Sequence, residues 1–357
     1  MTNATDTDMV GMLRDTMQRY AAEQYGFAQR RTVLGEGWSR QAWRDYAGFG
    51  WLALRLPEDD GGIDADATTL GALMEVVGAR LLMEPVLASA VLGTGLVLAS
   101  ADAAQRAALL PSLADGTLTL AFACEDAAGH GCALRSDRLH GVKVNVLHGD
   151  VAGRLVVSAR DAAGDAALCL VDPADAGVER RPYRLVDGRG AARLRFEGAR
   201  VERLAAADAQ QAIDRARDEA AVALCAEALG VVRSLVAATC GYLKVRKQFG
   251  RTIGSNQALQ HRMVEMFLLQ EEVQALTRAA QRSLDGEPAG RGRAVSGARA
   301  YIATAARRVA NDAVQMHGGL GITEELDISH YFRRVMVINA LFGSRDEHFA
   351  RFVEVAA

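Results

Sequence analysis

Residues 315–325 read Gln-Met-His-Gly-Gly-Leu-Gly-Ile-Thr-Glu-Glu, and this stretch carries most of the information about the fold. It follows a run with helical spacing, Ala300 to Ala313, and so predicts a helix that ends in a Gly-Gly turn. Two adjacent glycines carry no Cβ, so they either stop a helix or let backbone amides approach an anionic ligand. The segment alone leaves both interpretations open.

A second segment, residues 246–254, reads Arg-Lys-Gln-Phe-Gly-Arg-Thr-Ile-Gly. Its Arg246 offers a forked cation that suits phosphate oxygens, although a cation at a helix end also suits the helix dipole. Together the two segments resemble the C-terminal domain of the acyl-CoA dehydrogenase family of flavoproteins. Weaker matches to the same family lie at residues 50–62, 105–111 and 114–116.

The periodicity of apolar residues predicts the order helical, β, helical along the chain. The expected fold is α+β and acyl-CoA dehydrogenase-like. It has an N-terminal helical domain (1–116), a middle β-barrel or sheet domain (117–205) and a C-terminal antiparallel four-helix bundle (206–357). Helices are expected at 9–24, 39–48, 68–80, 85–99, 208–247, 256–284, 293–313, 322–337 and 346–355, with a short one that Asp102 caps and Pro111 ends. Strands are expected at 117–123, 142–147, 154–158, 167–171 and 192–196.

Composition excludes several classes of protein. The net charge of −3 over 357 residues gives no electrostatic case for binding nucleic acid or an anionic membrane. Five dispersed cysteines without Cys-x-x-Cys spacing indicate free thiols in a reducing compartment, with no disulfide framework or metal site. The N-terminus lacks a basic segment followed by an apolar one, so a cytoplasmic location is expected.

The resemblance implies FAD as cofactor. In the family, the matching residues contact the FAD pyrophosphate and adenosine across a subunit interface. The matching positions here are Arg246, Gln248, Phe249, Gln315, Gly318 and Gly319, and Ser344 is a further candidate for cofactor binding. This arrangement implies a homo-oligomer or a heterotetramer with a second acyl-CoA dehydrogenase subunit.

The strand that normally lies against the flavin ring departs from the family pattern. Family members carry Trp-x-Thr-Asn after Gly-x-Lys, whereas residues 141–149 here read Gly-Val-Lys-Val-Asn-Val-Leu-His-Gly. Asn145 stands where the aromatic is expected, Leu147 replaces the hydroxyl, and His148 replaces the Asn. His148 is either a replacement hydrogen-bond donor or a surface histidine in a turn.

The catalytic base of the family is also missing from its usual place. The segment that carries the Glu matches residues 341–344, and Phe342 occupies the Glu position. Other relatives carry the Glu on the long helix, at the position of Ala220. Glu219 is its neighbour, turned by about 100°. Glu219 is therefore the candidate base, with Glu227 further along the helix, and each also suits a structural or surface carboxylate.

The variant segments look most like the small subunits of pimeloyl-CoA-dehydrogenase-type enzymes. The expected function is a subunit of an FAD-dependent dehydrogenase that oxidises an acyl-CoA to the 2-enoyl-CoA, with a Glu-bearing partner subunit. Electrons would pass to an electron-transfer flavoprotein or a similar acceptor. The alternative is a non-catalytic structural or regulatory paralogue. A third interpretation keeps the fold but changes the chemistry, as in a flavin oxygenase or a dehydrogenase of carrier-bound acyl groups.

Overall fold

The computed structural model describes residues 4–354, which form two compact units. The first unit comprises the chain up to Thr32, Ala67–Leu82 and the chain from Ala221 onward, and the second comprises Val33–Asp66 and Met83–Ala220. The division into three domains stays a prediction, and its outermost residues, 1–3 and 355–357, lie outside the described part.

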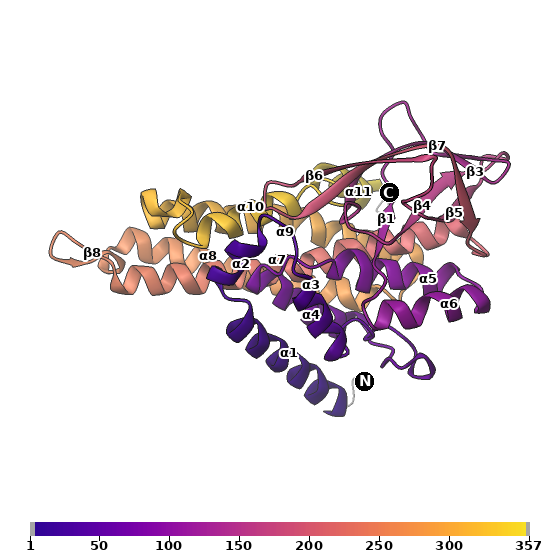
Figure 1. Ribbon diagram of the computed structural model, residues 1–357. Coiled ribbons are helices and arrows are strands. Elements are labelled where there is room, and N and C mark those ends of the chain that lie inside the picture. The colour runs from indigo at the N-terminus through magenta and orange to yellow at the C-terminus, as the bar shows by residue number, and fades with distance from the viewer. Residues whose placement is uncertain (1–3, 355–357) are drawn as a thin grey trace. The chain divides into compact units, whose positions relative to one another are not determined.

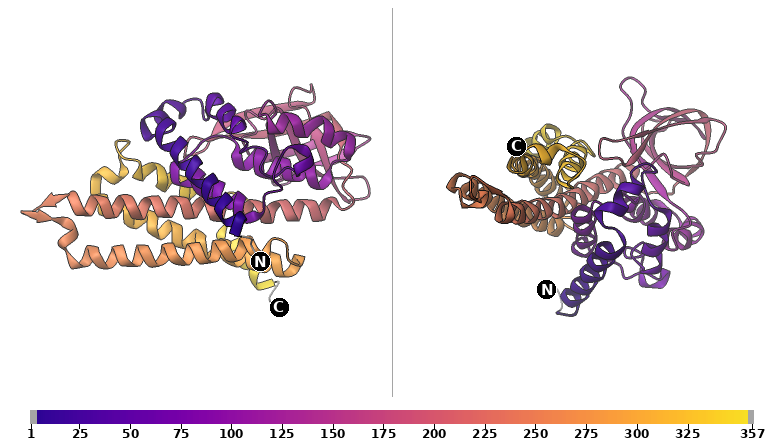
Figure 2. Two further views of the ribbon diagram at one scale, coloured as in Figure 1. Left: turned by 90° about the horizontal axis from the view of Figure 1, so that it is seen from below. Right: turned by 60° about the vertical axis from the view of Figure 1, so that its left-hand side comes forward.

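The first unit is helical. Its helices are α1 (Ala4–Gln24), α2 (Phe27–Val33), α4 (Ala67–Arg80), the larger part of α7 (Ala209–Val245), α8 (Gln257–Ser283), α9 (Pro288–His317), α10 (Ile328–Ile338) and α11 (Arg345–Glu354), with 3₁₀ turns η3 (Ile253–Ser255) and η4 (Gly318–Ile322). Helices α7 and α8 run antiparallel and are joined by a short hairpin, and α9 packs along α8 (Figures 1 and 2). The predicted helical C-terminal region is confirmed.

Close helix packing in this unit depends on two glycines. A Cβ on Gly78 of α4 would lie 2.0 Å from the carbonyl oxygen of Glu227 on α7. A Cβ on Gly230 of α7 would lie 1.9 Å from the carbonyl oxygen of Glu75 on α4. Since no real side chain tolerates such contacts, the two backbones approach each other only because both positions are glycine.

Helix α7 is 37 residues long and, among the described residues, is the one helix long and apolar enough to cross a bilayer. In its most apolar window, however, 83% of the residues are buried inside the protein. Burial on this scale is typical of a core helix that is apolar on all sides.

The second unit combines short helices with a closed sheet. Its helices are α3 (Arg40–Gly48), η1 (Glu58–Asp60), the π-helix η2 (Val86–Gly93), α5 (Thr94–Ser100) and α6 (Ala103–Ala114). Its strands are β1 (Leu120–Ala123), β2 (Ala133–Arg135), β3 (Arg138–Leu147), β4 (Arg154–Arg160), β5 (Ala166–Val171), β6 (Val178–Arg184) and β7 (Gly190–Arg203). The pairings β4–β5, β5–β7, β7–β3, β3–β2 and β2–β4 close a ring, which confirms the predicted barrel or sheet.

The alternation of buried and exposed side chains along a strand builds the core of the sheet, and its absence explains why two strands were not predicted from the sequence. On β7, Ala192, Leu194 and Phe196 are buried while the residues between them are exposed. The predicted strands all carry such apolar positions. Strand β6, by contrast, is exposed at every position after Val178, and β2 has three residues. Neither therefore shows an apolar pattern.

The capping residues predicted the starts of two helices correctly, whereas a proline did not predict a helix end. Ser39 accepts a hydrogen bond from the Ala42 amide at 3.1 Å, and Asp102 forms a capping box with Gln105, as predicted. The predicted stop at Pro111 is wrong, because α6 continues to Ala114. A proline lacks the amide donor and crowds the carbonyl four residues earlier, but the Pro111 carbonyl still accepts from the Asp115 amide at 3.0 Å, so the last turn forms.

Other helix boundaries also differ from expectation, and the helix expected at 322–337 begins only at Ile328. The segment expected as one helix at 85–99 begins as a fully buried π-helix and becomes α-helical at Thr94. Helix α9 begins at Pro288 rather than at residue 293, because proline suits the first helical position, where its missing donor has no partner to lose.

All five cysteines are free thiols, three of them buried and two, Cys124 and Cys240, half-buried. Burial is the main cause that raises the pKa of Cys132 to about 12, so its thiol stays protonated at neutral pH.

Candidate functional site

The Arg-Lys-Gln-Phe-Gly segment forms a hairpin directly after α7. Strands β8 (Lys247–Gln248) and β9 (Arg251–Thr252) pair antiparallel, and the hairpin projects beyond the ends of α7 and α8 (Figures 1 and 2). Phe249 and Gly250 at its tip have φ angles of +52° and +79°, as in the two-residue turns that match strand twist. The Phe249 side chain is 100% exposed in the single chain. A bulky apolar ring held in the left-handed region and in water suits a surface that another subunit or ligand covers.

The Gly-Gly segment forms the end of α9. Gly318 has φ +62° and ψ −144°, a conformation that favours glycine, and it stops the helix. A Cβ on Gly318 or Gly319 would meet no atom within 4 Å, so both lie open to a ligand. Gly321 is different, because a Cβ there would lie 2.6 Å from the Val314 carbonyl oxygen. The segment therefore both stops the helix and presents an open backbone.

One aromatic contact joins the two segments. The Tyr242 ring on the last turns of α7 stacks on the His317 ring at the end of α9, with centroids 4.3 Å apart. The His317 Nδ1 lies 2.8 Å from the Ala313 carbonyl oxygen, which fixes the ring. Tyr242 precedes Arg246 by one helical turn, and His317 follows Gln315 by two residues. The structure thus brings both predicted cofactor segments to one end of the first unit.

The side chains at this end fit a dinucleotide cofactor by their chemistry. Arg246, Gln248 and Gln315 are exposed, and none has a side-chain hydrogen-bond partner among the described residues. A guanidinium, two amides and an open Gly-Gly backbone supply the donors that diphosphate and adenosine need. Their cofactor role stays a prediction.

Ser344 is placed differently from the other predicted cofactor residues. Its hydroxyl accepts a hydrogen bond from the Glu347 amide at 3.3 Å, and its own amide donates to Glu347 Oε2 at 2.7 Å. This reciprocal pair caps α11. The hydroxyl proton remains able to donate, so cofactor binding by Ser344 is still a prediction.

Asn145, which replaces the family aromatic, lies at a break in the pairing of β3 with β7 and has φ +54°. Its Oδ1 accepts from the Tyr183 hydroxyl at 3.1 Å, and its Nδ2 donates to Glu125 Oε1 at 2.9 Å. The amide is held from both sides, so this strand presents a fixed polar group instead of an aromatic plane.

His148 is a buried residue, so one of its two expected roles, that of a surface histidine in a turn, is wrong, while the role of a replacement donor stays a prediction. It does end β3 with φ +53°, but only 3% of its surface is exposed. Its Nε2 lies 3.0 Å from the Met83 carbonyl oxygen. Burial with this contact gives the ring a packing role that the sequence did not indicate.

Phe342, in the family's Glu position, is half-buried and has φ +54°. Its carbonyl oxygen lies 3.2 Å from His348 Nε2, and a Cβ on the following Gly343 would come within 2.9 Å of the same imidazole atom. The backbone turn is therefore tightly specified. The side chain at its apex has no group that takes a proton.

Glu219, the candidate base, is held by two arginines of the second unit. Arg55 binds it through a fork, with Nη1 at 2.7 Å from Oε2 and Nη2 at 2.8 Å from Oε1. Arg215, one turn earlier on α7, donates from Nε to Oε1 at 2.8 Å. Burial opposes ionisation of Glu219, but the attraction and hydrogen bonds of the arginines outweigh it and lower its pKa. Protonation of this carboxylate would weaken its ion pairs with Arg55 and Arg215. The role of Glu219 as catalytic base stays a prediction.

Replacing Glu219 by Gln is expected to lower the free energy of unfolding by about 1.5–3 kcal/mol at pH 7, since hydrogen bonds to charged groups are lost. Because the folded pKa is depressed, this stabilisation is present above the unfolded pKa of about 4.3 and is lost as pH falls towards the folded value. Urea unfolding of both proteins at pH 7 and pH 3.5 should therefore show a smaller difference at the lower pH. An equal difference at both would contradict the ion-pair assignment.

Glu227, the other carboxylate considered, is a structural residue. Its two oxygens accept from Arg334 Nε and Nη2, each at 2.7 Å, and both side chains are at most 2% exposed. The sequence offered one signal for these pairings, the i, i+4 spacing of Arg215 and Glu219. Arg55 and Arg334 are 164 and 107 residues away from their partners, and no local pattern marks them.

Two family models match the chain. The acyl-CoA dehydrogenase N-terminal domain matches residues 7–117, and the acyl-CoA dehydrogenase C-terminal domain matches residues 209–354. The chain belongs to the acyl-CoA dehydrogenase family. Members of this family are flavoprotein oxidoreductases of lipid metabolism.

Three similar proteins each match 90% or more of the chain. Acyl-CoA dehydrogenase FadE34 of Mycobacterium tuberculosis is 30% identical over 90% of this chain, which spans only 42% of that protein. Acyl-CoA dehydrogenase IpdE2 of the same organism is 28% identical over 90% of this chain and 89% of its own length. The solved structure of a variant of the Tcur3481-Tcur3483 steroid ACAD is 26% identical, with a TM-score of 0.90 over 98% of both chains.

Proposed function

We propose that this acyl-CoA dehydrogenase family member is a subunit of an FAD-dependent enzyme that oxidises an acyl-CoA to the trans-2-enoyl-CoA. The reaction removes a proton from Cα and a hydride from Cβ of the thioester. When bound, FAD would supply the acceptor for that hydride. An electron-transfer flavoprotein or similar acceptor would then reoxidise the enzyme.

The observation that carries this proposal is the convergence of the two cofactor segments at one end of the first unit. There Arg246 would bind diphosphate oxygens, Gln248 and Gln315 would hydrogen bond to the nucleotide half, and Gly318 and Gly319 would let the backbone approach it. The same end carries the exposed Phe249. The proposed cofactor site is exposed in the single chain. This exposure is consistent with a cofactor shared across a subunit interface, as the family resemblance implies.

A partner subunit is proposed to supply the base. Phe342 has no ionisable group, and Glu219 is engaged by Arg55 and Arg215. Asp346 and Glu347 lie exposed in the first turn of α11, where acidic residues suit the helix dipole. The similar Tcur3481-Tcur3483 protein is named for two components, which supports a heteromeric enzyme. Its name also suggests a steroid-derived acyl-CoA as one substrate to include in assays.

The second candidate is a non-catalytic paralogue, which the occupied Glu219 and the Phe342 replacement favour. The two proposals differ in their flavin chemistry. A purified complex with a flavin spectrum that acyl-CoA bleaches under anaerobic conditions supports the dehydrogenase. A stable complex without flavin, or with flavin that no acyl-CoA reduces, supports the paralogue. Flavin that acyl-CoA does not bleach anaerobically, but that oxygenates the acyl group in the presence of oxygen once an external reductant such as dithionite has reduced it, would instead indicate oxygenase chemistry.

Arg246→Gln is expected to weaken FAD binding about 10–150-fold, because one charge-assisted contact to phosphate contributes roughly 1.5–3 kcal/mol. Lys244→Gln is the matched control, because it removes an exposed charge two residues earlier, in the last turn of α7. It should leave the flavin content unchanged. The measurement is flavin absorbance per chain after dialysis, with the oligomeric state followed by light scattering. A monomeric wild type that retains full flavin would count against a cofactor site shared between subunits, and so would an Arg246→Gln variant that retains full flavin.

A further inference from the structure

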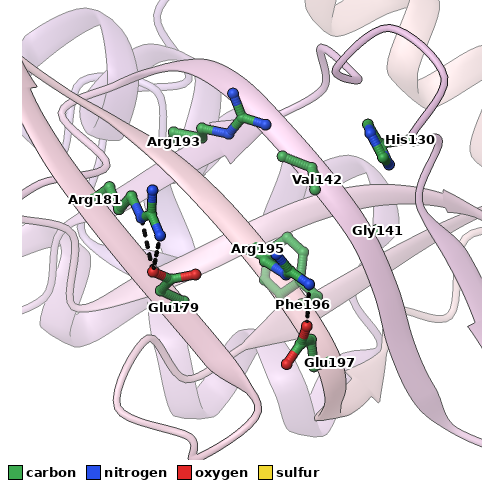
Figure 3. A pocket seen from close by; sticks show the side chains of 9 residues that line it. All are labelled: His130, Gly141, Val142, Glu179, Arg181, Arg193, Arg195, Phe196 and Glu197. Carbon is green, nitrogen blue, oxygen red and sulfur yellow. Dashed lines mark hydrogen bonds and ion pairs between the residues drawn. The ribbon is translucent and has the colours of Figure 1, made fainter.

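A pocket on the outer face of the sheet is left unexplained by the proposed function. It has a volume of about 420 Å³ and shares no residue with the segments 246–254 and 315–325, although Gly141 and Val142 of its lining begin the strand segment that lies against the flavin ring in the family. Its charged lining comes from β6 and β7, with His130 and Val142 from the neighbouring segments (Figure 3). The charged residues are Glu179, Arg181, Arg193, Arg195 and Glu197.

The strand register creates this grouping. Strands β6 and β7 pair antiparallel, so that Glu179 lies directly opposite Arg195 and Arg181 lies directly opposite Arg193. The first of these pairs joins opposite charges, as the solvated face of a sheet usually does. The second places two cations side by side, which destabilises an isolated sheet. The Arg181–Arg193 pair therefore lacks the opposite charges that cross-strand pairs on a solvent-exposed sheet face usually have.

The carboxylates do not balance the arginines. Arg181 binds Glu179 at 2.7 Å, and Arg195 is paired with Glu197. Arg193 has no hydrogen-bond or ion-pair partner within the described part of the chain, and Figure 3 shows its guanidinium apart from both carboxylates. Three guanidinium groups against two carboxylates leave one positive charge, and each paired arginine keeps further N–H donors.

We propose that this pocket binds the phosphate group of a small phosphorylated organic molecule. A guanidinium fork matches two phosphate oxygens, and an anion between Arg181 and Arg193 removes their repulsion. The pocket volume lies within the range of about 300–1,000 Å³ that small-molecule sites have, which favours an organic ligand over a bare ion. The His130 ring and the Val142 side chain give that organic part a less polar wall.

The test uses ADP as the phosphorylated probe, with inorganic phosphate and adenosine as its two halves. Calorimetric titration of the purified chain is done with saturating FAD present, so that ADP does not enter the proposed cofactor site, and at low ionic strength, because exposed charges are screened by salt. Arg193→Gln removes the unpaired cation. Arg135→Gln removes an exposed arginine of β2 outside the pocket and is the matched control. Circular dichroism of both variants checks that the fold is retained.

ADP is expected to bind the wild type and the Arg135→Gln control alike, to bind Arg193→Gln at least tenfold more weakly, and to bind more tightly than phosphate or adenosine. Three results would overturn the proposal: no binding of ADP by the wild type, an equal loss in both variants, or inorganic phosphate binding as tightly as ADP. Flavin content and acyl-CoA turnover do not enter this test, so its failure leaves the proposed function untouched.

Discussion

Mixed with a partner subunit that carries a carboxylate at the position of Phe342, the chain is expected to oxidise acyl-CoA about 10²–10⁴-fold faster than it does alone. This is the range that a positioned general base contributes. Phe342 cannot take the Cα proton, and Glu219 would have to leave two arginines to do so. The assay is reduction of a dye acceptor by a panel of acyl-CoAs, including a steroid-derived one.

Two variants sharpen this result. Phe342→Glu in the isolated chain should raise turnover if the residue faces the substrate, whereas Phe342→Gln, of similar size and without a base, should not. Glu219→Gln tests the alternative base. If the isolated chain turns over strongly and keeps that activity after Glu219→Gln, both the incomplete site and the candidate base are refuted. Activity of the isolated chain that Glu219→Gln abolishes would instead establish Glu219 as the base.

Removing one partner of the buried Glu227–Arg334 pair is expected to cost about 3–5 kcal/mol of unfolding free energy, because an uncompensated charge stays in the core. Of the two single changes, Glu227→Gln should lower the free energy of unfolding more than Arg334→Met. Arg299 is fully buried nearby, and its pKa is lowered by burial and by repulsion from Arg334; it would then face a guanidinium whose charge Glu227 no longer balances. Chemical denaturation at neutral pH measures both losses.

The double variant Glu227→Gln/Arg334→Met provides the control. With both charges gone, the loss should be well below the sum of the single losses, since coupling within a buried pair is strongly non-additive. Additive losses would show that the two side chains do not depend on each other. Glu265→Gln, which breaks the exposed pair with Arg308, should change stability by about 1 kcal/mol or less.

Local patterns predicted much of this protein. Apolar periodicity placed the long helices α7 and α8 to within two residues, because core helices keep their 3.6-residue spacing over many turns. Capping residues such as Ser39 and Asp102 marked helix starts, since a cap and its partner lie three residues apart. The two predicted cofactor segments could be recognised by their resemblance to the family because each is a contiguous run of residues; their cofactor role stays a prediction.

Features formed between distant segments escaped prediction. Strand β6 is exposed along its length and has no alternation to detect; it exists because β7 pairs with it. His148 looked like a turn residue at the surface, but the Met83 carbonyl and the surrounding chain bury it. Pro111 signals a helix stop in isolation, whereas α6 continues past it to Ala114 despite the lost amide donor.

The sequence by itself determined the family, the helical and β regions and the place of the two segments predicted to bind the cofactor, because each depends on residues a few positions apart. Only the tertiary structure decided the state of the carboxylates. Glu219 and Glu227 look alike on one helix, yet each is bound by an arginine more than 100 residues away in the chain. For Glu219, burial raises the pKa and the contacts of its arginines lower it by more; since neither its burial nor Arg55 is encoded locally, the chemistry of this carboxylate follows from the packed fold.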